Sequence, residues 1–322
     1  MNIPMIIFLF ILIAGGLLGL EIYRELHHFR VTHYTIESQK FKGFSRDLNL
    51  IFLSDLHNRV YGEKNEPLLQ AIRNEKPDLI LIGGDMLVGK EDASYDIALD
   101  FTSQLPQIAP VLYATGNHEQ RMRENESEAK NDEDTETGNH EQRMRENPEI
   151  YQASYADYRQ QLKDRGVLFL ENGSCRIEAG TVLLEISGVE LPSASYKKLK
   201  KLPIRASDIA EYLHKDSVSV TEDSVYRILL AHNPAYMNAY KGWGADLILS
   251  GHLHGGVMRL PGIGGVITPQ AFLFPKYSGE MTKEGEQTII VSRGLGTHTI
   301  NIRLFNQPEV VSICLKRSEN KK

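Results

Sequence analysis

The sequence of 322 residues predicts an α/β fold for most of the chain. Several apolar runs are long enough for strands that are covered on both faces, and helical stretches alternate with these runs in the first half of the chain. The second half is richer in strands. A chain of this length, less roughly forty residues at its N-terminus, fits one large domain with an ample hydrophobic core.

The pattern of apolar residues and turn signals predicts the order of the elements. Strands are expected at residues 49–54, 79–83, 110–115, 167–170, 174–178, 181–188, 226–231, 246–250, 287–292 and 309–315. Helical stretches are expected near residues 66–75, 93–104, 149–165, 206–214 and 235–241. The regular alternation at the start favours a layered α/β arrangement over separate all-β and all-α parts.

The N-terminus predicts a membrane anchor. Residues 3–20 carry no charge and are nearly all apolar, which meets the minimum length for a membrane-spanning helix. No Lys or Arg precedes this run and no clear small-residue cleavage site follows Leu20, so an uncleaved anchor is favoured over a signal peptide. The basic residues that follow the run are Arg24, Arg30, Lys40 and Lys42. The positive-inside rule then predicts a single-pass protein whose domain is on the cytoplasmic side.

Five short polar motifs each follow one of the predicted apolar strands. They are Asp55-Leu56-His57, Gly84-Asp85, Gly116-Asn117-His118-Glu119, His232 and Gly251-His252-Leu253-His254. Carboxylate oxygens and imidazoles are ligands of divalent first-row metals, and polar groups at the carboxyl ends of strands gather at one edge of an α/β fold. Any one motif alone is more often a turn or an exposed loop. Together, in this order, they predict a two-metal hydrolase site.

This set of motifs resembles that of the calcineurin-like metallophosphoesterases, over roughly residues 45–315. Further segments resemble a membrane-anchored branch of that superfamily, the transmembrane metallophosphoesterase-domain proteins: Gly255-Gly256, Ser292–Gly296 and Arg303–Glu309. The resemblance implies a four-layer fold, a two-sheet β-sandwich flanked by helices, after one N-terminal transmembrane helix. The predicted division of the chain is an anchor at 1–22, a juxtamembrane linker at 23–44, the phosphoesterase domain at 45–316 and a polar tail at 317–322.

The resemblance also implies a role for each motif residue. The first metal ion would be held by Asp55, His57, Asp85 and His254. The second would be held by Asp85, Asn117, His232 and His252, so that Asp85 bridges the two ions. His118 would be the proton donor or would stabilise the transition state. The expected cofactors are two divalent cations, with Mn²⁺ preferred and Fe, Zn or Co as alternatives.

The expected activity is hydrolysis of phosphate mono- or diesters or of pyrophosphates, by attack of a metal-bridging hydroxide. The substrate would be a phosphorylated small molecule or a lipid-linked one, since some relatives in this branch cleave the pyrophosphate of UDP-diacylglucosamine. Some bacterial relatives are exported, which leaves the opposite membrane orientation open. Two alternatives are a non-catalytic scaffold on the same fold, which would have lost ligands, and a metal sensor or buffer, which would not need His118.

An eleven-residue repeat interrupts the family pattern. The segment Thr115–Asn125 recurs unchanged at Thr137–Asn147, and the duplicated or inserted stretch covers about residues 120–148. Two Gly-Asn-His-Glu motifs therefore compete for one site. Only the first follows an apolar strand, which favours Asn117 and His118 over Asn139 and His140. The rest of the duplicated stretch is expected to be an extended helix or a surface insertion.

The net charge of the chain gives little information about its partners. The formal net charge is −6, and residues 126–136 alone hold six acids and one Lys, a net of −5. No basic stripe is present, so no nucleic-acid partner is expected. The basic run Tyr196–Lys201 is either a solvated loop or a contact for an anionic head group. Cys175 and Cys314 are expected to be free thiols.

Overall fold

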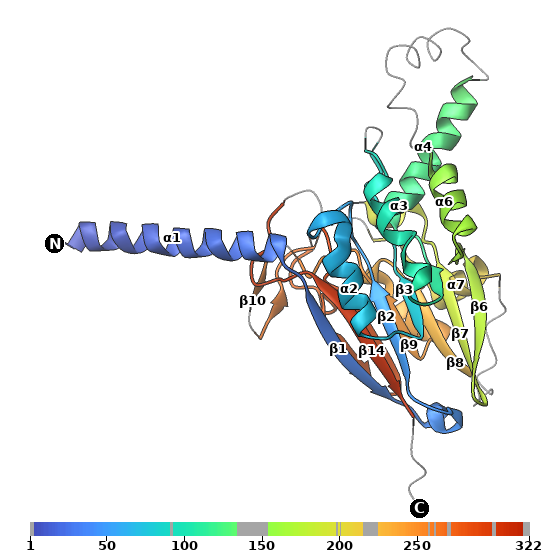
Figure 1. Cartoon of the computed structure of the whole chain (residues 1–322). Coiled ribbons are helices and arrows are strands. Elements are labelled where there is room, and N and C mark those ends of the chain that lie inside the picture. The colour runs from blue at the N-terminus through green and yellow to red at the C-terminus, as the bar shows by residue number, and fades with distance from the viewer. Residues whose placement is uncertain are drawn as a thin grey trace, which may run out of the picture.

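Two six-stranded β-sheets form the body of the protein (Figure 1). The computed structural model describes residues 3–90, 93–133, 154–197, 199, 201–214, 225–256, 258–260, 262–268, 272–297 and 301–317. Apolar residues of both sheets share one buried cluster, which includes Leu50, Phe52, Ile228 and Leu249. The two sheets are therefore packed face to face as a sandwich.

The first sheet has the strand order β1-β14-β2-β3-β4-β5. The strands are β1 (Arg30–Glu37), β14 (Glu309–Lys316), β2 (Leu48–Leu53), β3 (Leu79–Ile82), β4 (Val111–Tyr113) and β5 (Val167–Phe169). Strands β2 to β5 are parallel, whereas β14 runs antiparallel to β2 and parallel to β1. The central strands are almost wholly buried, as their continuous apolar sequences predicted.

The second sheet has the strand order β12-β13-β9-β8-β7-β6. Its strands are β12 (Met281–Glu284), β13 (Gln287–Val291), β9 (Leu247–Ser250), β8 (Val225–Ala231), β7 (Val182–Val189) and β6 (Gly173–Ala179). The four inner strands β13, β9, β8 and β7 are parallel, and the two edge strands are antiparallel to their neighbours. A separate two-stranded ribbon consists of β10 (Arg259–Leu260) and β11 (Gly264–Gly265).

Helices cover the outer face of each sheet. Along β2, Leu50 and Phe52 face the second sheet, whereas Ile51 and Leu53 face outward, because successive side chains of a strand point to opposite sides. The outward side chains pack against α2 (Glu66–Asn74), α3 (Asp96–Thr102) and α6 (Tyr155–Asp164). The second sheet packs likewise against α7 (Ala206–Tyr212) and α8 (Met237–Trp243). These layers confirm the predicted two-sheet sandwich flanked by helices.

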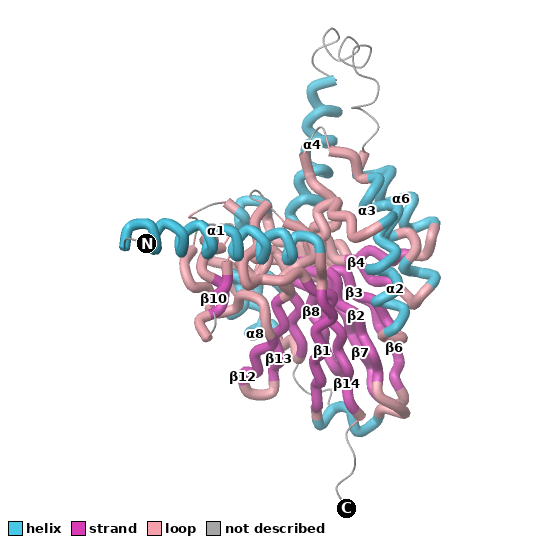
Figure 2. The backbone as a smooth tube through the Cα atoms, turned by 60° about the vertical axis from the view of Figure 1, so that its left-hand side comes forward, coloured by secondary structure: helices cyan, strands magenta, loops and turns pink. Residues whose placement is uncertain are grey.

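Helix α1 (Ile3–His27) projects away from the sandwich (Figures 1 and 2). It is the one helix in the described part of the chain that is long and apolar enough to cross a membrane, and its apolar stretch is not buried against the protein. Its last turn is attached to the domain. The buried Glu25 accepts the backbone N–H of Asn306 at 2.9 Å, and the carbonyl of Leu26 accepts a hydrogen bond from Arg59.

Four strands were not expected from the sequence: β1, β10, β11 and β12. Strand β1 lies inside the predicted linker and completes the edge of the first sheet; its sequence is rich in β-branched residues but shows only weak burial alternation. Helix α4 (Asn117–Glu133) begins at the third motif and continues into the duplicated stretch, where an extended helix was one of the two expectations. The second copy of the repeat, Thr137–Asn147 with Asn139 and His140, lies outside the described residues, as do residues 149–153 of the helix expected near 149–165. How the chain divides into domains stays a prediction.

Candidate metal centre

The predicted site residues all follow the carboxyl ends of strands that lie side by side. Within the first sheet, Asp55 and His57 follow β2, Asp85 follows β3, and Asn117 begins α4 after β4. The residues from the second sheet are His232 after β8, and His252 and His254 after β9. Because parallel strands present their carboxyl ends at one edge, both sheets contribute to the same place.

The acidic and imidazole side chains of these motifs form three overlapping buried groups. The groups are Asp55 with His57 and His254, Asp85 with His232 and His252, and His57 with Asp85 and His118. Within each group the potential ligand atoms lie within 4.8 Å of one another. Asp85 belongs to two of the groups, which is the position that a bridging carboxylate needs.

The backbone at the site adopts conformations that L-residues rarely occupy. Positive φ angles occur at Asp55 (55°), His57 (47°), Asp85 (56°), His252 (66°) and His254 (50°). Each such conformation costs on the order of 1 kcal/mol and persists only where the surrounding structure imposes it. Strain of this kind concentrates at functional sites, so its occurrence at five of the candidate residues supports a functional role.

Two glycines allow the loops after β3 and β4 to approach each other. A β-carbon at Gly84, whose φ is +94°, would lie 2.2 Å from the backbone nitrogen of Gly116. A β-carbon at Gly116 would lie 2.2 Å from Oδ1 of Asp85. The glycines of the second and third motifs therefore let the backbone pass close to the side chain of Asp85.

Hydrogen bonds to backbone carbonyls orient two of the histidines. Nδ1 of His232 lies 2.7 Å from the carbonyl oxygen of Gly83, and Nδ1 of His254 lies 3.1 Å from that of Gly296. A ring nitrogen beside a carbonyl carries a proton, so Nε2 is the nitrogen of each ring that could bind a metal ion. These Nε2 atoms face the carboxylates, at 3.0 Å from Oδ2 of Asp85 for His232 and 3.3 Å from Oδ1 of Asp55 for His254.

The two aspartates differ in their protonation. Burial raises the pKa of Asp55 to about 7, although its carboxylate accepts the backbone N–H of His252 and the hydroxyl of Ser54 at 2.5 Å. Burial acts in the same direction on Asp85, but the positive charges of nearby histidines, His232 above all, outweigh it and hold the pKa of Asp85 well below its usual range. Negative charge is thus concentrated on Asp85, where a cation would be bound.

Asn117 provides a test of whether the site fits a metal ion. Its Oδ1 is buried and accepts no hydrogen bond from any of the described residues. A buried carbonyl oxygen without a partner is costly, and a cation would satisfy it. Together with two carboxylates and four imidazoles, this oxygen makes a donor set of the type that binds divalent first-row metals.

Glu119 has a role that sequence reasoning missed. Glu119 is the last residue of the third motif, and no role was predicted for it. Its buried carboxylate accepts the backbone N–H groups of Asp85, Met86 and Gly116, each at 2.9 Å. It also accepts the hydroxyl of Tyr113 at 2.7 Å. Glu119 therefore joins the loop after β3 to the start of α4. A charged residue directly after two candidate site residues was the available signal.

His118 is oriented by a backbone donor. The backbone N–H of Gly89 donates to Nδ1 of His118 at 2.8 Å, so the ring carries its proton on Nε2. The ring stands edge-on to that of His57, with 4.7 Å between the centroids. His118 is 3% exposed and lies within the group that contains His57 and Asp85. Its ring therefore lies among the candidate metal ligands.

A layered α/β sandwich with carboxylates and imidazoles gathered at its strand ends is the framework of a metal-dependent hydrolase. A family model described as calcineurin-like phosphoesterase matches residues 48–256. The chain therefore belongs to the calcineurin-like phosphoesterase family, as the sequence predicted.

Curated relatives agree with this family. The chain is 26% identical to the uncharacterized metallophosphoesterase YkuE of Bacillus subtilis (strain 168), over 95% of this chain and 92% of that protein. It is 26% identical to the phosphodiesterase YaeI of Escherichia coli (strain K12), over 85% of this chain and 84% of that protein. An uncharacterized metallophosphoesterase of Aquifex aeolicus (strain VF5) is 28% identical, over 94% and 98% respectively. These homologues support a phosphoester hydrolase.

Proposed function

We propose that this protein is a membrane-anchored phosphohydrolase that uses two divalent metal ions to cleave phosphate mono- or diesters or pyrophosphates. The observation that carries the proposal is the sharing of Asp85 between two buried groups of potential ligands. The retention of all the motif residues argues against the non-catalytic scaffold.

The ligands would divide between the two ions as the family resemblance implies. One ion would be held by Asp55, His57, Asp85 and His254, and the other by Asp85, Asn117, His232 and His252. When bound, the two ions lower the pKa of a water molecule that can attack phosphorus, and they neutralise charge on the phosphoryl oxygens. The hydrogen bonds from His232 and His254 to backbone carbonyls fix the orientation of the two rings and leave Nε2 as the nitrogen that would bind an ion. We propose Mn²⁺ as the native ion, with Fe, Zn or Co as alternatives.

His118 would act as a hydrogen-bond donor rather than as a proton donor. Its Nδ1 already accepts the N–H of Gly89, so giving up the Nε2 proton would leave an imidazolate, which is unfavourable. A fixed N–H donor instead stabilises the charge that develops on a phosphoryl oxygen in the transition state. This favours the second of the two roles that the family resemblance left open.

We propose a substrate in which the phosphate is attached to a membrane lipid. The similarity to the phosphodiesterase YaeI supports a phosphodiester, and helix α1 would hold the domain beside a bilayer. UDP-diacylglucosamine is one such candidate, with a pyrophosphate as the scissile group. The basic residues after the apolar run favour a cytoplasmic domain.

Removing the metal ions tests the proposed function. The full-length protein in detergent is expected to hydrolyse bis-p-nitrophenyl phosphate with Mn²⁺, to lose this activity after dialysis against a chelator, and to regain it when Mn²⁺ is added back. The whole chain is needed because β1 belongs to the first sheet. Metal binding without hydrolysis would support the sensor or the scaffold instead.

Replacing His118 with Asn separates the two possible roles of this residue. Oδ1 of Asn can still accept the N–H of Gly89, but nothing takes the place of the Nε2 donor, so we expect kcat to fall roughly a hundred- to a thousandfold with metal content unchanged. The loss should be equal for bis-p-nitrophenyl phosphate and for diphenyl phosphate, whose leaving group needs a proton more. A much larger loss with diphenyl phosphate would mean proton donation. His33→Asn, at an exposed histidine, is the control.

A further inference from the structure

Large apolar side chains are exposed on the face of the domain beside α1. Six of them lie within the described residues 262–268, 272–274 and 301–306, with exposed fractions between 36% and 63%: Ile263, Phe272, Leu273, Phe274, Ile302 and Phe305. We call these six side chains the apolar rim. Figures 1 and 2 both show β10, which directly precedes the first segment, on the side of the domain from which α1 leaves.

The backbone holds the apolar rim in place. The N–H of Thr268 donates to the carbonyl of Phe272, and the N–H of Phe274 donates to the carbonyl of Val266, both at 2.9 Å. Phe274 and Phe305 have φ angles of +47° and +55°, which are strained for a bulky residue. The exposed rings are thus held outward by ordered structure at a cost in free energy, which points to a function for their exposure.

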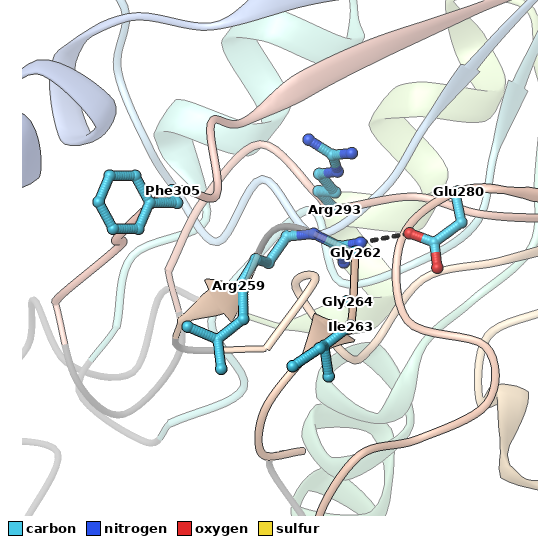
Figure 3. Close-up of a pocket in the computed structure, with 8 residues that line it drawn as sticks. Arg259, Gly262, Ile263, Gly264, Glu280, Arg293 and Phe305 are labelled. Atoms are coloured by element: carbon cyan, nitrogen blue, oxygen red, sulfur yellow. Dashed lines mark hydrogen bonds and ion pairs between the residues drawn. The ribbon is translucent and has the colours of Figure 1, made fainter.

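A cleft of about 400 Å³ opens between the two segments (Figure 3). Ile263 and Phe305 line it together with Arg259, Arg293 and Glu280, and Arg259 is paired with Glu280. Apolar side chains beside cationic groups are the combination that suits the boundary between lipid chains and anionic head groups. None of the candidate metal ligands lines this cleft.

Helix α1 and the apolar rim are attached to each other. Glu25, in the last turn of α1, accepts the backbone N–H of Asn306, the residue after Phe305. Leu26 accepts a hydrogen bond from Arg59 of the domain. If the uncharged residues 3–20 cross a bilayer, residues 21–27 traverse the head-group region, and the rim lies at the level of the membrane surface.

We propose that the apolar rim is a membrane-contact surface, which inserts into the interface of the bilayer that α1 crosses. The proposal rests on the membrane anchor of the proposed function and adds a second attachment, formed by the domain itself. Its partner is the bilayer, because the rim is attached to the end of α1 through Asn306 and borders a cleft lined by Arg259 and Arg293. A domain attached at α1 and at the rim has one fixed face toward the lipid.

This surface also specifies where the substrate would arrive. The side chain of Asn306 donates to the carbonyls of His254 at 2.6 Å and Gly256 at 2.5 Å. The membrane-contact surface is therefore one hydrogen bond away from the loop that carries a candidate metal ligand. A phosphate in the head-group region would reach the metal centre from this side without the lipid leaving the bilayer.

Tryptophan fluorescence in lipid nanodiscs tests the contact. The chain has a single Trp, Trp243, which is buried in α8 and gives a constant background. Three full-length variants would be reconstituted into phosphatidylethanolamine and phosphatidylglycerol, with and without bromine on the acyl chains: Phe10→Trp in α1, Leu273→Trp in the rim and Leu168→Trp as the control. Leu168 is exposed like the rim but lies on β5, at the opposite edge of the first sheet from β1.

We expect brominated lipid to quench Phe10→Trp strongly, Leu273→Trp by roughly half, and Leu168→Trp not at all. Quenching of Phe10→Trp without that of Leu273→Trp would overturn the contact surface and leave the anchor intact. If Leu273→Trp is not quenched by brominated lipid and is nevertheless shielded from aqueous acrylamide, a second copy of the chain covers the rim instead. No quenching of Phe10→Trp would overturn the anchor and this inference with it. Hydrolysis of bis-p-nitrophenyl phosphate, measured on the same samples, reports separately on the enzyme.

Discussion

Asp85→Asn is expected to remove nearly all hydrolysis. The substitution keeps the size of the side chain and an oxygen that can accept the backbone N–H of His118, but it removes the charge shared by two groups of potential ligands. Loss of one metal ion, at about 4 kcal/mol of transition-state stabilisation, corresponds to a decrease of about a thousandfold in kcat/KM for bis-p-nitrophenyl phosphate.

Metal content and thermal unfolding should be measured on the same variant. We expect Asp85→Asn to bind fewer Mn²⁺ ions per chain and to unfold cooperatively, because the hydrogen bonds of Glu119 to the neighbouring loops remain. The matched control is Asp100→Asn, at an exposed aspartate of α3, which should leave activity and metal content unchanged. Full activity of Asp85→Asn at limiting Mn²⁺ would remove Asp85 from the proposed centre.

The second large effect is expected within the repeat. Asn117→Ala removes a buried oxygen at the start of α4 that no described residue satisfies, so the second metal ion would lose a ligand. We expect a decrease in kcat/KM of about a hundredfold, at roughly 3 kcal/mol, with weaker binding of one of two Mn²⁺ ions.

The chain contains its own control for this variant. Asn139 has the same eleven-residue surroundings in sequence as Asn117, but no apolar strand precedes it. Asn139→Ala should therefore leave both activity and metal stoichiometry unchanged. The reverse pattern, an inactive Asn139→Ala beside an active Asn117→Ala, would mean that the second copy of the motif occupies the site.

Much of the fold follows from local sequence. The apolar runs before Asp55 and Asp85 predicted β2 and β3, because buried parallel strands need nearly continuous apolar residues. Strand β1 escaped prediction because an edge strand is covered on fewer sides and alternates only weakly. Its place depends on pairing with β14, far away in the sequence, and no local pattern contains such a partner.

For the candidate site, too, the sequence predicted some features and not others. The identity of the motif residues and their positions after strands were predictable, and the structure brings these residues together. The hydrogen bonds that hold these residues in place were not predictable from the sequence. The bond from Gly89 to His118 and the three N–H groups around Glu119 join loops that follow different strands. Clustering of the apolar rim beside α1 likewise depends on tertiary structure, since Phe274 and Phe305 lie in separate segments.

The position of β14 has a consequence for biosynthesis. This strand lies between β1 and β2, so residues 309–316 separate two strands that emerge from the ribosome long before them. While the chain is being made, β2 to β5 can already pair, whereas β1 has no neighbour. Strand β1, and α1 with it, can therefore join the first sheet only after β14 has been synthesised. During that interval the exposed edge of β2 is a target for chaperones.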